Sequence, residues 1–144
     1  MEQLHVILHF DGLRLLLPQQ DIISVEVSED LLPLRDDETD AQQAGIVGWV
    51  YLERQQNPVY CLSTDLTLQQ NIPTQHEVIV VLQIKQGLFG LSCERIEPLS
   101  QHQQLHSVPV CMQRKQSPVS HLVIHQNSIA HLVNAEEMAN YLFP

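Results

Sequence analysis

Apolar and polar residues alternate over much of the chain with the two-residue period that is typical of half-buried β-strands. The alternation runs through residues 4–10 and resumes through residues 13–17, with the tight-turn signal Asp11-Gly12 between the two runs. This arrangement predicts a β-hairpin. Pro18 should end the second strand because it lacks a backbone donor, and the β-branched segment 22–27 predicts a third strand, entered through a helical turn.

Three further hairpins are indicated by the same alternation and by turn residues between the runs. Their strands span residues 46–52 and 59–62, 78–84 and 88–91, and 122–124 and 129–133. The first of these turns has no glycine, so we expect it to be loose. The strand over 78–84 opens with five consecutive apolar residues, which predicts burial on both of its faces.

The remaining segments are connections and one helix. Residues 36–43 carry a block of negative charge without an apolar period and predict a solvated loop, and residues 100–118 predict an irregular connection. Asn134 is a candidate N-cap for a closing helix over residues 135–142. Many short strands without strand-helix alternation favour a barrel or a sandwich.

Composition narrows the classes of function. The length of 144 residues fits one domain over residues 1–144, and 44% hydrophobic residues are enough to build a core. Seven Lys and Arg stand against seventeen Asp and Glu, and the net charge of -10 opposes binding to nucleic acid or to an anionic membrane. No apolar run approaches the roughly 20 residues that span a bilayer.

The cysteines and the first residues indicate a reducing compartment. The three cysteines cannot all pair, none lies in a CxxC motif, and residues 2–10 carry Glu2, His5 and His9 rather than a signal peptide. We therefore expect a cytoplasmic protein with no cofactor.

Eight histidines raise the question of a metal site. His121 and His125 lie four residues apart, as do His102 and His106, a spacing that suits a metal only on a helix. On a strand the first pair would lie about 13 Å apart, so we expect no bound metal.

A Cys-His nucleophile built on Cys61 or Cys93 is the corresponding enzymatic alternative. Both thiols sit in apolar strand patterns, where cysteine packs as a small hydrophobe, and no glycine-rich elbow accompanies either. We expect neither catalytic residues nor an enzyme, which leaves a module that binds other proteins.

Four segments in this order resemble the CheW-like domain, the adaptor of bacterial chemosensory arrays. The similarity covers nearly the whole chain. Its segments are the hairpin 8–17 with Ile22-Ile23-Ser24-Val25, then Gly48-Trp49-Val50-Tyr51-Leu52 with Pro58-Val59-Tyr60-Cys61-Leu62, then residues 78–84 through Gly90-Leu91-Ser92-Cys93-Glu94-Arg95-Ile96, and finally Leu132-Val133-Asn134.

The resemblance implies a mainly β fold of two small five-stranded, SH3-like β-barrel lobes that share a core, with a C-terminal helix. It also implies a non-enzymatic adaptor that couples the cytoplasmic tips of methyl-accepting receptors to the regulatory domain of a histidine kinase. From it we select Ile22, Val25, Glu53 and Arg54 as partner-binding residues. Leu88 and Phe89 are further candidates, for which core packing is the alternative.

The chain also departs from the family pattern. Leu52-Glu53-Arg54 stands where the family has Leu-Arg-Gly, so a carboxylate replaces an arginine associated with coupling. Charge reversal at an interface changes partner choice. We interpret the chain as a divergent paralogue serving another chemosensory system, such as one that controls type IV pili and twitching. A small β-barrel metal-binding or Cys/His hydrolytic protein, and a degenerate adaptor that only occupies array positions or dimerises, are the competing hypotheses.

Overall fold

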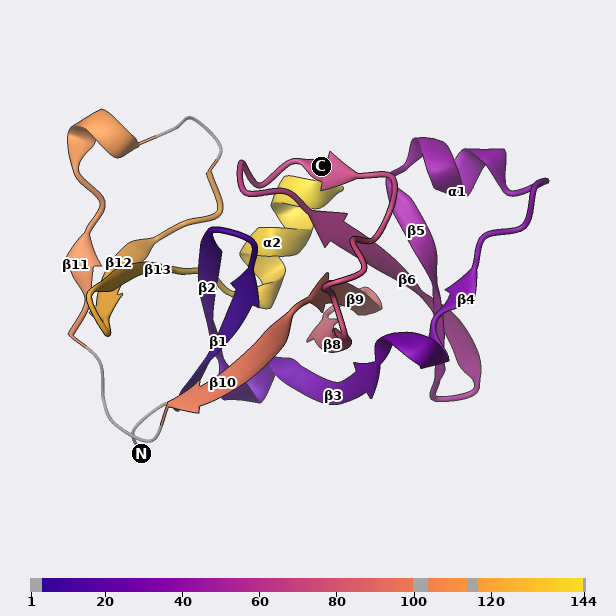
Figure 1. Cartoon of the computed structure of the whole chain (residues 1–144), viewed down its shortest axis with the longest axis horizontal. Coiled ribbons are helices and arrows are strands. Elements are labelled where there is room, and N and C mark those ends of the chain that lie inside the picture. Colours follow the sequence, from indigo (N-terminus) through magenta and orange to yellow (C-terminus); the bar gives the residue numbers. More distant parts are fainter. Residues whose placement is uncertain (1–3, 100–103, 114–116, 144) are drawn as a thin grey trace.

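The computed structural model describes residues 4–99, 104–113 and 117–143. Its strands form two sheets, and each sheet curls into a small lobe (Figure 1). The terminal lobe takes its strands from both ends of the chain, and the central lobe takes them from the middle. Helix α2 lies between the two lobes.

Each lobe has five strands of five or more residues within the described ranges, as predicted. The terminal lobe contains β1 (His5–Phe10), β2 (Leu13–Pro18), β10 (Arg95–Leu99), β12 (His121–His125) and β13 (Ser128–Leu132), with the two-residue strand β11 (His106–Ser107). The central lobe contains β3 (Ile22–Val27), β5 (Ile46–Leu52), β6 (Gln55–Leu62), β8 (Val78–Ile84) and β9 (Gly87–Cys93), with the two-residue strands β4 (Leu32–Pro33) and β7 (Leu68–Gln69). The helical segments are η1 (Gln19–Asp21), η2 (Ser28–Asp30), α1 (Thr39–Gln43), η3 (Val110–Met112) and α2 (Ala135–Leu142).

The two lobes have the same strand order. All four predicted hairpins are present, and one parallel pair joins the two hairpins of each lobe: β2 with β13, and β6 with β9. In each lobe, one hairpin is followed along the chain by a strand that crosses to the other lobe. Strand β3 leaves the terminal lobe to pair with β8, and β10 leaves the central lobe to pair with β1. This reciprocal exchange makes each lobe depend on a strand supplied from the other.

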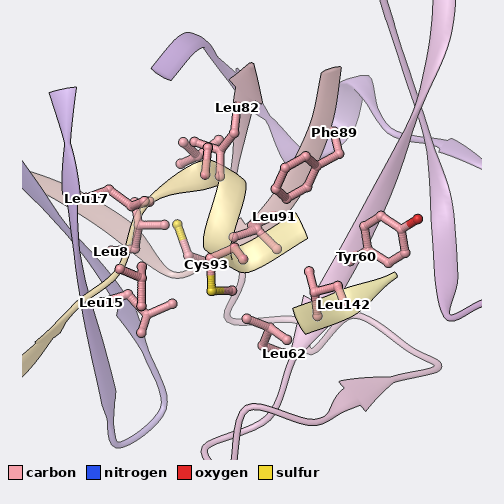
Figure 2. Close-up of a cluster of buried hydrophobic side chains, with 14 of the residues drawn as sticks. Leu8, Leu15, Leu17, Tyr60, Leu62, Leu82, Phe89, Leu91, Cys93 and Leu142 are labelled. Atoms are coloured by element: carbon pink, nitrogen blue, oxygen red, sulfur yellow. The ribbon is translucent and has the colours of Figure 1, made fainter. Parts of the chain in front are cut away.

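Apolar side chains form three clusters, one inside each lobe and one between them. The alternation along β8 links two of these, because Ile79 and Val81 fill the central lobe while Val80 and Leu82 face the shared cluster. All four side chains are fully buried, which confirms the predicted double burial. Figure 2 shows the shared cluster, in which Leu8, Leu15 and Leu17 of the terminal lobe meet Phe89 and Leu91 of the central lobe.

Helix α2 confirms the predicted closing helix and its cap. The side chain of Asn134 accepts a hydrogen bond from the backbone N–H of Glu137 at 2.8 Å. Asp21 accepts from the N–H of Ala135, and Glu136 accepts from the N–H of Lys85. These bonds fasten the start of the helix to the connection before β3 and to the β8–β9 turn. No helix among the described residues has the length and apolar character to cross a bilayer.

The acidic segment 36–43 differs from its prediction as a loop, because residues 39–43 form the short helix α1. Glu38, the residue before it, accepts hydrogen bonds from the backbone N–H of Arg35 and from Nε1 of Trp49. These bonds hold the pKa of the Glu38 carboxyl below its ordinary value. The described part of segment 100–118 contains β11 and η3, while residues 100–103 and 114–116 lie outside the described ranges.

Candidate protein-interaction surface

Strand β3 forms the edge of the central sheet and carries an exposed apolar stripe. Its outward positions are Ile23, Val25 and Val27, with exposed fractions of 41%, 45% and 54%. We call these three residues the β3 stripe. Edge strands usually carry charges or proline, since a flat apolar edge invites association. Three aliphatic side chains at successive outward positions of an edge strand therefore indicate a binding surface.

Alternation along β3 decides which side chains reach this surface, because half-buried and exposed positions alternate from Ile22 to Val27. The pairing with β8 shifts register between Ile22 and Ser24, and the alternation continues through this shift. Ile22 is half-buried and packs against the shared core, whereas Val25 is exposed. The structure thus gives these two predicted residues different surroundings. Ile23 and Val27 were missed, although counting alternate positions outward from Val25 would have found both.

Carboxylates lie beside the β3 stripe. Glu29 and Asp30 follow β3 directly in η2 and are exposed. Glu26, between two stripe residues, is half-buried and accepts a hydrogen bond from the Ser24 hydroxyl at 2.6 Å. The stripe is therefore apolar at its centre and negative at one end, which favours a partner with apolar side chains and nearby cations.

The β5–β6 turn contains Glu53 and Arg54, and it is tight rather than loose. Both residues are exposed, and their φ angles of 53° and 66° lie in the left-handed region. Two such residues between paired strands make a two-residue hairpin turn, for which Asn-Gly or Asp-Gly is the usual sequence. The prediction of a loose turn was wrong because it rested on the absence of glycine from the turn. It did not consider side chains outside the turn.

Asn57, which is only 2% exposed, explains how the turn closes without glycine. Its side-chain amide nitrogen lies 3.3 Å from the carbonyl oxygen of Val50 and 3.2 Å from those of Leu52 and Gln55. The Asn57 N–H groups thus donate to carbonyls on both strands beside the turn. Because these bonds compensate for backbone strain, Glu53 and Arg54 are held at a fixed, exposed tip.

Leu88 and Phe89, the further contact candidates, are buried and take the core-packing role that was their alternative. Their exposed fractions are 8% and 1%. The Phe89 ring packs against Tyr60 and Phe143, with ring centroids 6.3 Å and 5.5 Å away. Leu88 packs inside the central lobe. Both side chains face inward because β9 is central in its sheet and its two faces cover the two cores.

The structure also brings a cysteine and a histidine together. The Nδ1 atom of His76 lies 2.9 Å from Ser92 Oγ and 3.8 Å from Cys61 Sγ. All three residues are buried. Burial raises the pKa of the Cys61 thiol and lowers the pKa of His76, so both groups are held neutral. Burial also raises the pKa of Cys93 to about 12. These thiols are protonated and inaccessible, and the site has the character of a buried polar network.

The histidines of β12 have separate roles. His125 lies 3.1 Å from Glu97, while His121 sits at the other end of the strand. Over the described residues, no group of three His, Cys, Asp or Glu side chains is arranged to hold a metal ion. His102 lies outside the described ranges, and His106 is exposed on β11.

Two small lobes with the same strand order, an exchanged strand between them and a closing helix define a CheW-like fold, as the sequence predicts. The structure is similar to the crystal structure of the scaffolding protein TtCheW from Thermoanaerobacter tengcongensis, with a TM-score of 0.71 and 16% sequence identity, over 92% of this chain and 89% of that one. No family model matches the sequence, and no curated protein matches it.

Proposed function

We propose that this protein is a non-enzymatic adaptor of a bacterial chemosensory system, which couples the cytoplasmic tips of methyl-accepting receptors to the regulatory domain of a histidine kinase. The observation that carries this proposal is the β3 stripe, an exposed aliphatic edge on a fold shared with a scaffolding protein. Partners of this kind would place the protein in the cytoplasm.

The stripe suits a transient interface. Three half-exposed aliphatic side chains provide a small apolar centre, and signalling contacts that form and dissolve fall at the small end of interface sizes. The tip formed by Glu53 and Arg54 would add charge selectivity at a rigid position, because charges at the rim of an interface govern steering and specificity more than affinity.

Glu53 also supports the assignment to a divergent paralogue. An adaptor with a carboxylate at a position where the family carries arginine would favour a differently charged partner. We propose that this partner belongs to a separate chemosensory system, such as one that controls type IV pili. Deleting the gene would then impair twitching and leave swimming unchanged, whereas a swimming defect alone would contradict this pathway.

Binding to purified partners tests the coupling role. We expect the protein to bind a kinase regulatory domain and a receptor-tip fragment from its own organism in calorimetry. Val25→Glu should weaken binding to at least one of them by tenfold or more, since it places a carboxylate in the stripe.

Leu4→Glu is the matched control, because Leu4 is equally aliphatic and 46% exposed but lies just before β1 of the terminal lobe, outside the stripe. Absence of binding to both partners would contradict the adaptor role. Equal losses from the two variants would contradict the assignment of the stripe.

A further inference from the structure

A second apolar surface lies on the terminal lobe, on the outer face of β11, β12 and β13. Leu122 pairs directly with His106 on one side and with His131 on the other, and Ile124 pairs with Ile129. Directly opposed residues share a sheet face, so these five side chains lie on one face. Ile124 and Ile129 have exposed fractions of 62% and 47%. We call these five residues the β11–β13 face.

This face continues the sheet surface that forms the shared core. His131 pairs with Leu15 of β2, and the Leu15 side chain is completely buried in the shared core. The central lobe and α2 cover the sheet at β2, while its face at Ile124 and Ile129 remains open. The isoleucines are therefore the uncovered part of an otherwise packed apolar surface.

The charge of this region is opposite to that of the rest of the chain. Between Glu97 and Glu136 the sequence contains no Asp or Glu, although it contains five of the eight histidines and the two cations Arg114 and Lys115. Residues 22–93, in contrast, contain ten acidic residues and three basic ones. Arg114 and Lys115 lie outside the described ranges, so they contribute here only through the charge of the segment.

A hollow of about 590 Å³ adjoins the face. Leu122 and His131 line it from the sheet, and Val108 and Met112 line it from the segment that follows β11. Among its described lining residues the one carboxylate is Asp65, which belongs to the central lobe. A side chain docked beside the isoleucines thus has an adjacent recess with mixed polar and apolar walls.

We propose that the β11–β13 face binds an acidic amphipathic segment of a partner protein, with its apolar side chains on Ile124 and Ile129 and its carboxylates toward His106 and His131. Salt screens charges beyond about 8 Å, so for a docked segment the strands β11, β12 and β13, which contain no Asp or Glu, count for more than the net charge of -10. The β3 stripe, which adjoins carboxylates, would prefer cations, so the two faces select partners of opposite charge.

Two designed peptides test this proposal on the full chain. Both have leucines at helical spacing, and the remaining positions are glutamate in one peptide and lysine in the other. In NMR titrations at low salt, we expect the Leu/Glu peptide to shift amide signals of β12 and β13, and 0.5 M salt to weaken this binding several-fold. Ile124→Glu should abolish these shifts, and Val25→Glu should preserve them.

The proposal is overturned if the Leu/Glu peptide leaves the β12 and β13 signals unchanged, or if both peptides shift them equally, since that result would indicate apolar adhesion without charge selection. Sedimentation of the protein alone supplies the other decisive result. If the protein forms a dimer and Ile124→Glu dissociates it, the β11–β13 face binds a second copy of this chain. That result would overturn the proposal that the face binds a segment of a partner protein. Because this test uses neither kinase nor receptor, its outcome is independent of the proposed coupling role.

Discussion

The Nε2 atom of His9 lies 3.0 Å from Oε1 of Glu97. This contact connects the inside of the terminal lobe to its edge strand β10. His125 of β12 lies 3.1 Å from the second oxygen of the same carboxylate. Strands β10 and β12 are not neighbours in the sheet order, so this side-chain bridge links strands that backbone pairing does not.

The bridge predicts acid sensitivity. Burial holds the pKa of His9 below its ordinary value of 6.5, and hydrogen bonds from His125 and His9 hold the pKa of Glu97 below 4.5. The unfolded chain therefore binds more protons than the folded one. The contribution of His9 should be lost as pH falls from 6.5 toward its folded pKa, and that of Glu97 as pH falls below 4.5. Urea unfolding at a series of pH values measures this loss.

His9→Gln should flatten the pH dependence below pH 6.5, whereas His106→Gln, at an exposed position, should not. His76 keeps part of the slope in both variants, because burial also lowers its pKa. A slope that His9→Gln leaves unchanged would show that the burial of His9 does not control stability in this range.

The β5–β6 turn should respond in opposite directions to two substitutions. Arg54→Gly removes the strain of a side chain at a φ of 66° and should stabilise the protein by about 1 kcal/mol. Asn57→Ala removes the donor to the carbonyls beside the turn and should destabilise it by about 1–3 kcal/mol. Denaturant midpoints measure both effects. Destabilisation by Arg54→Gly would contradict the interpretation that the Arg54 backbone is strained.

Gly48 is required by close packing rather than by a special φ angle. A Cβ at this position would lie 2.8 Å from the backbone oxygen of Leu32 and 2.7 Å from a methyl carbon of Leu31. Gly48→Ala should therefore displace β4 and cost roughly 1–3 kcal/mol. Gly12→Ala is a useful comparison, since its φ of 74° is strained but its new carbon would meet only Thr64, at 3.5 Å. Amide exchange in β4 should rise in the first variant alone.

Phe89 distinguishes packing from partner contact. Phe89→Ala removes a ring that is 1% exposed and should cost about 3–5 kcal/mol in the free energy of unfolding. At a temperature where the variant remains folded, its affinity for either partner should match that of the parent protein. A tenfold loss of affinity in the folded variant would restore Phe89 as a contact residue.

Glu53 tests whether the protein is an active coupler. Glu53→Arg reverses one exposed charge on a rigid turn and should change the association rate with the partner several-fold, more strongly at low salt. Glu53→Gln should give about half of this effect on a logarithmic scale. An unchanged rate and unchanged signalling would favour the degenerate adaptor that only occupies a position in the array.

The sequence alone predicted the elements whose signals are local. The hairpins follow from alternation and turn residues, the double burial of β8 from its unbroken apolar run, and the start of α2 from the capping side chain of Asn134. The order of four short motifs predicted the CheW-like fold, because each motif marks a strand or turn that the fold requires at that place.

Long-range contacts decided the rest. Pairing of β3 with β8 at the sheet edge placed Ile22 against the core and left Val25, on the opposite face, in solvent, and the amide of Asn57 made a glycine-free turn tight. Tertiary structure also exchanged β3 and β10 between the lobes and joined Cys61 to His76 inside the protein. The sequence by itself determined which segments are strands and which residues are apolar. Only the tertiary structure determined which apolar residues remain exposed, because exposure depends on the face that a neighbouring strand covers.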